Sequence, residues 1–162
     1  MDIEFKKITD FRRGTLANLL KDGYSFEPRF ENYWQNQWQE FDDFFYDNPQ
    51  IAEQCGFITV LGREPIGLVS WDPRKLPESV EMGHNCIISK YKGNGYGKRQ
   101  MREAVNRIIA QGTKKIIVWT NEKLAAAQHT YESVGFIFIK KSEETICPEL
   151  AGQRIYYEML LK

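Results

Sequence analysis

Three glycines at alternate positions constrain this chain more than any other feature. Lys92-Gly93-Asn94-Gly95-Tyr96-Gly97 follows a strand-like run, Glu81 to Ile88, and leads directly into an amphipathic helical pattern. Glycine permits positive φ angles and the close approach of a ligand to the backbone. The first N–H groups of a helix lack partners within the helix and carry the positive end of its dipole. The stretch therefore predicts a strand, a tight turn and a helix N-terminus that together bind an anion, most often a phosphate.

The two familiar phosphate loops do not match this stretch. A P-loop ends in Gly-Lys-Ser/Thr, whereas Gly97 is followed by Lys98 and Arg99. The dinucleotide fingerprint needs a further glycine three residues after the second, and the two candidate positions hold Lys98 and Gln100. The acidic residue that would hold a ribose about 20 residues further on is missing, because Trp119 lies there. The neighbouring residues must therefore identify the ligand.

Length and charge point to a single domain over residues 1–162. The 42% of hydrophobic residues are enough for a sizeable core. Lys plus Arg and Asp plus Glu number 22 each, so no global field favours a nucleic acid or an anionic membrane as partner. No apolar stretch approaches the length needed to span a membrane, and the first residues do not form a signal peptide.

The cysteines indicate a reducing compartment. Cys55, Cys86 and Cys147 are odd in number and widely spaced, so they match neither a metal motif nor a disulfide framework. Cys147, next to Pro148, is interpreted as incidental. We therefore expect a cytoplasmic protein without a bound metal.

Apolar spacing predicts an α/β fold with one central mixed sheet of about six to seven strands, flanked by four helices. The expected strands are residues 3–8, 56–61, 66–71, 80–88, 115–120, 136–139 and 155–160. Four helices are expected: one from Thr9-Asp10 to Gly23, one within 24–48 that ends at Asn48-Pro49, one over 98–111 and one over 124–134. Three consecutive strands should form an antiparallel meander. The 98–111 helix should then connect two parallel strands by a right-handed crossover. The apolar run 115–120 suggests burial on both faces.

This order of elements, together with two motifs, resembles the GNAT superfamily of acetyl-CoA-dependent N-acetyltransferases. The family's cofactor signature is Gln/Arg-x-x-Gly-x-Gly/Ala, and here Lys92 to Gly97 match it with Lys in the first position. Its second signature is an Ala four residues before a Tyr, then Glu and Gly-Phe, which matches Ala127 to Phe136. The resemblance covers nearly the whole chain and is strongest from Glu81 to Phe136.

The resemblance implies that acetyl-CoA is the cosubstrate. The backbone of Cys86, Ile87 and Ile88 would hold its pantetheine arm and polarise the thioester carbonyl. The remaining expected cofactor contacts are Lys92, Gly93, Asn94, Gly95, Tyr96, Gly97, Lys98, Asn121 and Ala127.

Two residues match positions that carry the family's acid–base chemistry. Tyr131 would protonate the leaving thiolate, and Glu81 would take a proton from the amine, often through water. His84 is the rival base, because its usual pKa lies closer to neutrality. It lies on the opposite strand face from Glu81, so only one of them should point at the acceptor. Cys86 is interpreted as a small core residue.

The segment 24–48 should line the acceptor side of the site. It contains ten aromatic residues and six carboxylates against one cation, Arg29. Tyr33, Trp34 and Trp38, with His84, are the expected acceptor contacts, and this composition suits a cationic or aromatic amine. The alternative is an acidic, solvated helix over an ordinary core.

The function expected from this resemblance is transfer of acetyl from acetyl-CoA to a primary amine by direct attack. The amine could belong to a small molecule, a peptide or a protein. Two alternatives stay open: a catalytically silent CoA-binding sensor or interaction module, and a nucleotide-binding domain. Family members are often homodimers.

Overall fold

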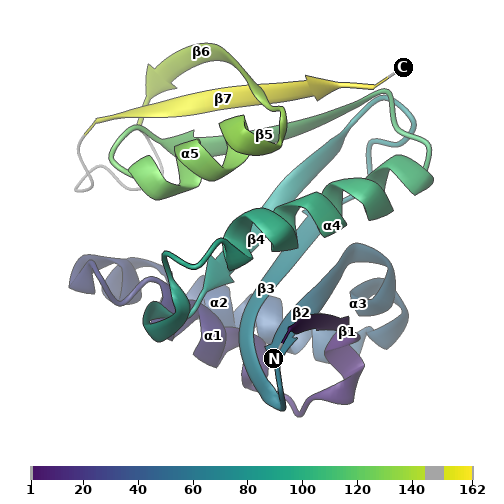
Figure 1. Cartoon of the computed structure of the whole chain (residues 1–162), viewed down its shortest axis with the longest axis vertical. Coiled ribbons are helices and arrows are strands. Elements are labelled where there is room, and N and C mark those ends of the chain that lie inside the picture. Colours follow the sequence, from purple (N-terminus) through teal and green to yellow (C-terminus); the bar gives the residue numbers. More distant parts are fainter. Residues whose placement is uncertain (1, 145–151, 162) are drawn as a thin grey trace. The chain divides into compact units, whose positions relative to one another are not determined.

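The strands form one mixed sheet in the order β1-β2-β3-β4-β5-β7-β6 (Figure 1). The computed structural model describes residues 2–144 and 152–161, so Cys147 lies outside the described residues. The predicted α/β class is confirmed. The chain divides into two compact units, Met1–Ser70 with His84–Gln100 and Trp71–Gly83 with Met101–Lys162. The expected single domain over 1–162 stays a prediction.

Antiparallel strands form the sheet of the first unit. β1 (Ile3–Lys6) pairs with β2 (Gly56–Leu61), and β2 pairs with β3 (Glu64–Asp72), which confirms the predicted hairpin. The buried side chains of Phe57, Ile58 and Leu68 supply much of its core. The following strand, β4 (Val80–Ile87), ends in this unit and leads into the glycine turn.

Three α-helices accompany these strands, where the sequence predicted two. α1 (Thr15–Gly23) and α2 (Pro28–Asp47) run side by side (Figure 1), and α3 (Pro49–Cys55) follows at once. α2 ends before Pro49 as predicted, but Pro49 also begins α3, because the first position of a helix does not use an N–H group.

The predicted start of the first helix at Thr9-Asp10 is wrong. Ile8–Asp10 forms a short 3-10 helix, and α1 begins only at Thr15. The reason lies in Gly14, whose φ of 98° places it in the left-handed region and separates the two helices.

The second unit combines a three-stranded antiparallel ladder with the beginning of β4. β5 (Lys115–Asn121) pairs with β7 (Gln153–Leu160), and β7 pairs with β6 (Ile137–Glu143). Val80 of β4 lies opposite Ile116 of β5 in parallel register, which confirms the predicted parallel pair joined through α4 (Tyr96–Ala110).

One helix covers one face of that ladder. α5 (Ala125–Val134) lies along it (Figure 1), and the Tyr131 ring centre is 6.1 Å from that of Tyr157. Tyr157 faces Val118 across the ladder, and Val118 is buried, whereas Trp119 is only half-buried. The predicted burial of β5 on both faces is therefore wrong, because α5 packs on one face alone. Within the described residues, no helix is long and apolar enough to cross a membrane.

Candidate functional site

The glycine turn has the backbone conformation that an anion cradle requires. Gly93 and Gly95 both have a φ of 80°, and α4 begins directly after them at Tyr96. The Arg99 amide donates to the Gly95 carbonyl at 3.2 Å and closes the first helical bond. The amides of Tyr96, Gly97 and Lys98 therefore precede the internal hydrogen bonding of α4, where a phosphate can accept from them.

The two turn glycines are needed for their backbone angles. A Cβ added to Gly93 or Gly95 would have no atom within 4 Å, so space is open beside both residues. The Asn94 side-chain amide donates to the carbonyls of Tyr91 at 3.0 Å and Lys92 at 3.3 Å, which fixes the shape of the turn. This arrangement fits a pyrophosphate group.

Lys92 has a second role that the sequence did not indicate. Its ammonium donates to the carbonyl of Gly23, the last residue of α1, and lies 4.4 Å from the centre of the Phe26 ring. Partial burial lowers the pKa of this lysine. The ammonium thus lies at the negative end of a helix dipole and ties the turn to α1. Its predicted contact with the pyrophosphate stays a prediction.

The end of β4 offers one backbone edge for a ligand. The Ile88 N–H donates to the Ile66 carbonyl at 2.8 Å, so it belongs to the sheet and is not available to a pantetheine arm. Because successive residues of a strand direct their N–H groups to opposite sides, the Ile87 N–H points to the other edge. Among the three residues predicted to hold that arm, Ile87 is therefore the one whose N–H points to the edge of β4 at which the arm could bind.

Cys86 is the small core residue that the sequence indicated. Its buried thiol donates to the Leu19 carbonyl at 3.4 Å, and burial raises the pKa of the thiol to about 12. A neutral thiol is a poor nucleophile, so the structure gives Cys86 a packing role.

Sequence reasoning missed Gln100, which joins α4 to three strands. The side chain is fully buried; its Oε1 accepts from the Thr59 hydroxyl at 2.6 Å. Its Nε2 donates to the Leu68 carbonyl at 2.8 Å and to Asn85 Oδ1 at 2.7 Å, and lies 3.2 Å from the Cys86 carbonyl. The sequence signal that could have identified Gln100 is its position: a polar residue next to Met101, which begins the apolar stripe of the helix.

Gly67 makes room for this network. A Cβ at Gly67 would lie 2.6 Å from the Cys86 carbonyl oxygen and 2.7 Å from Gln100 Oε1, closer than real Cβ contacts come. The β3 backbone can therefore approach β4 and Gln100 only because residue 67 has no side chain.

His84 is placed as a half-buried ring. Its ring centre lies 4.3 Å from that of Phe41, and its backbone N–H donates to Ser70 Oγ at 3.0 Å. Burial lowers the pKa of His84 to about 4. The imidazole is neutral at pH 7 and a weaker base than an ordinary histidine, which disfavours His84 as the rival base.

The second unit holds the predicted acid and base. Tyr131 is buried on α5, with its ring centre 5.7 Å from that of Phe136, and Gly135 caps the helix with a φ of 112°, as predicted. Ala127 lies one turn earlier on α5 and is half-buried. Glu81 is exposed on β4, opposite Ile117 of β5.

Asn121 is held by its own turn. Its Oδ1 accepts from the Lys123 amide at 2.8 Å, and its Nδ2 donates to Glu144 at 3.0 Å. The first contact closes the connection from β5 to α5, and the second joins it to the residue after β6, so both ends of the side-chain amide are used. The expected contact of Asn121 with the cofactor stays a prediction.

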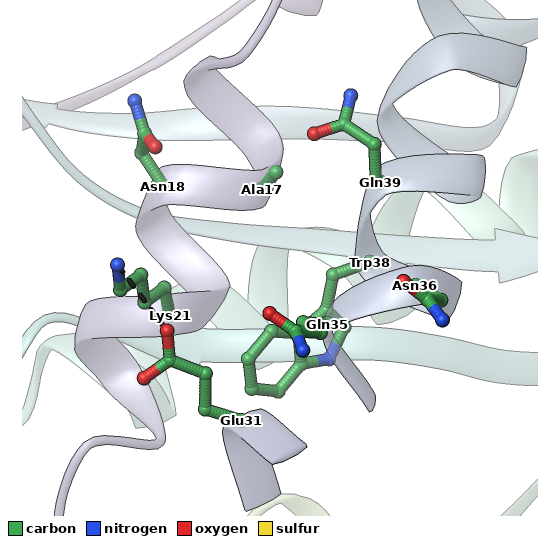
Figure 2. A pocket seen from close by; sticks show the side chains of 8 residues that line it. All are labelled: Ala17, Asn18, Lys21, Glu31, Gln35, Asn36, Trp38 and Gln39. Carbon is green, nitrogen blue, oxygen red and sulfur yellow. Dashed lines mark ion pairs between the residues drawn. The ribbon is translucent and has the colours of Figure 1, made fainter. Parts of the chain in front are cut away.

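The expected acceptor aromatics mostly pack on one another. Trp38 is buried and stacks on Tyr24, with ring centres 5.9 Å apart; Trp34 stacks on Phe30 at 5.0 Å, and Tyr33 is half-buried. Figure 2 shows Trp38 beside a surface cavity of about 300 Å³, whose other lining residues are Ala17, Asn18, Lys21, Glu31, Gln35, Asn36 and Gln39. An ion pair of 3.2 Å between Lys21 and Glu31 crosses this cavity, so α1 and α2 neutralise each other there.

The carboxylates of segment 24–48 have partners outside the segment as well as within it. The ion pairs join Arg13 to Asp43 and Asp47, Lys21 to Glu31, and Arg29 to Glu27. The sequence counted one cation because Arg13 and Lys21 lie outside the segment. Three cations therefore stand against the six carboxylates where the sequence counted one, which weakens the expected attraction of a cationic acceptor.

These features place the chain in a known class. It matches the sequence model of the Acetyltransferase (GNAT) family over residues 15–136, and it belongs to that family. It is 22% identical to N-acetylaspartate synthetase of Danio rerio over 108 residues, which are 65% of this chain and 38% of the synthetase. It is 27% identical to N-alpha-acetyltransferase 30 of Saccharomyces cerevisiae over 112 residues, 67% of this chain and 58% of that protein.

A solved structure shows the same fold. A chain of the NatC complex bound to Gag peptide and CoA superposes with a TM-score of 0.68 at 20% identity, covering 100% of both chains. The present chain spans well under two thirds of the length of the two curated relatives. Within the residues that the structure describes, no group of three or more His, Cys, Asp or Glu side chains is placed to hold a metal ion.

Proposed function

We propose that this chain is an acetyl-CoA-dependent N-acetyltransferase that transfers acetyl to a primary amine by direct attack. The observation that carries the proposal is the pair of left-handed glycines, Gly93 and Gly95, directly before the 15-residue helix α4. Membership of the acetyltransferase family and the names of the two relatives, which act on amines, support it.

The residues of the first unit suit the chemistry of coenzyme A. The amides of Tyr96, Gly97 and Lys98 would donate to the pyrophosphate oxygens, and the Ile87 edge of β4 would pair with the amides of the pantetheine arm. Acetyl-CoA supplies the acetyl group as an activated thioester. No metal ion is required for these steps.

Two side chains of the second unit would move the protons. Glu81 would accept a proton from the amine, whose nitrogen then forms a bond to the acetyl carbon. As the carbon–sulfur bond breaks, its electron pair passes to sulfur, and Tyr131 would donate a proton to that thiolate. The products are an acetylated amine and a free CoA thiol, without a covalent enzyme intermediate.

The decisive experiment compares Tyr131→Phe with the unchanged protein across a panel of amines, measuring release of the CoA thiol. The variant keeps the ring that packs on Phe136 and removes the hydroxyl that would donate the proton. General acid catalysis contributes about 10²–10⁴-fold, so kcat should fall by that factor with little change in acetyl-CoA affinity. Tyr157→Phe is the matched control, because its hydroxyl donates to Glu132. A near-normal kcat in Tyr131→Phe would show that Tyr131 contributes to packing and not to proton transfer.

The same assay, together with measurements of ligand binding and thermal stability, separates the alternatives. CoA binding without thiol release for any amine would favour the CoA-binding sensor, and stabilisation by ATP but not by CoA would favour the nucleotide-binding domain. The acceptor would be a small-molecule or peptide amine. A cytoplasmic location and a homodimer stay predictions.

A further inference from the structure

The face of the second unit's ladder opposite α5 carries a cluster of two rings and two cations. Trp119 and Tyr156 lie opposite each other on β5 and β7, with ring centres 4.8 Å apart. The Arg154 guanidinium lies 4.3 Å from the Trp119 ring centre, and the Lys140 ammonium lies 5.4 Å from that of Tyr156. Attraction between each cation and the aromatic faces holds both charges in place.

Neither of these cations forms an ion pair with a carboxylate in the described part of the chain, although the Lys140 charge acts weakly on Glu158. The nearby acidic residue, Glu158, is engaged by Lys115 at 3.1 Å and by the Tyr156 hydroxyl at 2.5 Å. Aromatic rings position a guanidinium without cancelling its charge, and a guanidinium presents a planar fork that matches a carboxylate. Arg154 and Lys140 therefore form a positive pole that is ready to receive an anion.

The predicted base lies on the same face and forms a negative pole. Glu81 is exposed and lies opposite Ile117, and residues 117 and 119 of β5 point to the same side of the sheet. Trp119 and Tyr156, the rings that hold the two cations, lie two residues along and one and two strands across from the level of Glu81. Because strands rise about 3.3 Å per residue and lie about 4.8 Å apart, these rings are roughly 8–12 Å from Glu81. The face therefore carries a negative charge at Glu81, where the amine would react, and a positive charge at Arg154 and Lys140, at a fixed distance from Glu81.

We propose that this face selects peptide acceptors that carry an acidic side chain two or three residues after the reactive N-terminal amine. An extended chain spans about 3.3–3.6 Å per residue, so three residues cover the separation of the poles. The α-amine would lie at Glu81, and the acidic side chain would bind Arg154 and Lys140. A free acidic amino acid is too short to reach both poles. This inference rests on the proposed function.

A set of peptides of equal length provides the test. One peptide has Asp at position 3, one has Asn there, and one has the Asp moved to position 7. The peptide with Asp at position 3 should have a kcat/KM about tenfold above the other two, mainly through a lower KM, because a charge-assisted bond is lost in each of them. Added salt should reduce this advantage.

Variants of Arg154 and Lys140 test whether these two cations cause the preference for Asp at position 3. Arg154→Gln should bring the three peptides close to parity, and Arg154→Glu should favour a peptide with Lys at position 3. Lys140→Gln, at an exposed position, provides a second variant if the Arg154 variants fold poorly. Lys114→Gln is the matched control, because it removes the same charge from a residue that pairs with Glu78 before β5 begins.

Calorimetric binding of the peptides to the CoA-loaded protein gives a readout that does not depend on turnover. Tighter binding of the peptide with Asp at position 3, lost in Arg154→Gln, supports the inference even if turnover is slow. Equal turnover of all peptides, or a preference for free aspartate over every peptide, would overturn it and leave the proposed function intact. Failure to acetylate any amine would instead count against the proposed function.

Discussion

The carboxylate of Asp42, in the C-terminal half of α2, caps the N-terminus of α1 at Gly14. Its two oxygens accept from the backbone amides of Gly14 at 2.9 Å and Ala17 at 3.0 Å, and the side chain is fully buried. Gly14 has no side chain to cap its own helix, so a residue 28 positions away along the chain satisfies the amides at this end.

Asp42→Ala should lower the free energy of unfolding by about 2 kcal/mol, because two half-buried amides would lose a charged acceptor. Urea denaturation followed by circular dichroism measures this loss. The control is Asp43→Ala, which breaks a partly exposed ion pair with Arg13 and should cost at most about 1 kcal/mol. Equal losses in the two variants would contradict the capping role.

Gly95→Val should abolish binding of CoA while the protein still folds. The residue has a φ of 80°, which a β-branched side chain disfavours, so the amides of the turn would move. Gly112→Val is the matched control: Gly112 also has a positive φ, of 86°, and open space, but it lies at the other end of α4. Titration calorimetry should show lost affinity in the first variant alone. If folded Gly95→Val binds CoA with unchanged affinity, the glycine turn is not the pyrophosphate-binding site.

Gln100→Leu should weaken binding of CoA more than binding of 3′-phospho-ADP, which keeps the pyrophosphate but lacks the pantetheine arm. The side chain supports the β4 backbone at Asn85 and Cys86, next to the expected pantetheine edge. We expect a loss of about tenfold for CoA, comparable to that of one hydrogen bond. Equal losses for both ligands would indicate a general effect on folding.

Thr59→Val provides the partner for a double-mutant cycle with Gln100→Leu. Because Thr59 donates to Gln100 at 2.6 Å, the two effects on the free energy of unfolding should not add. Additive effects would show that the two side chains act independently.

His84 should make stability depend on pH in mildly acidic solution. Burial lowers its pKa from 6.5 to about 4 in the folded protein, so between these values the unfolded chain binds more protons. Stability should be fully present above pH 6.5 and fall as the pH decreases toward 4, with a loss of about 2 kcal/mol at pH 5. Urea denaturation at pH 5 and pH 7 measures it. His84→Leu should lose this dependence; a variant with the same pH response would assign it to other groups.

The sequence by itself determined the elements whose signals are local. The alternate glycines predicted the turn before α4, Gly135 predicted the end of α5, and apolar periodicity predicted the strands and their parallel connection. Each depends on backbone angles or side-chain spacing within a few residues, so short-range sterics are enough to specify it.

Only the tertiary structure decided which distant groups meet. It brought Asp42 to Gly14, placed Arg13 and Lys21 beside carboxylates for which the sequence counted a single cation, and inserted Gln100 between strands. It also left the Trp119 face of β5 open, although the run 115–120 looked buried on both faces. Burial and charge pairing are properties of contacts between segments, and the energy of a polar group depends on the partners that folding supplies, so no local pattern in the chain could specify them.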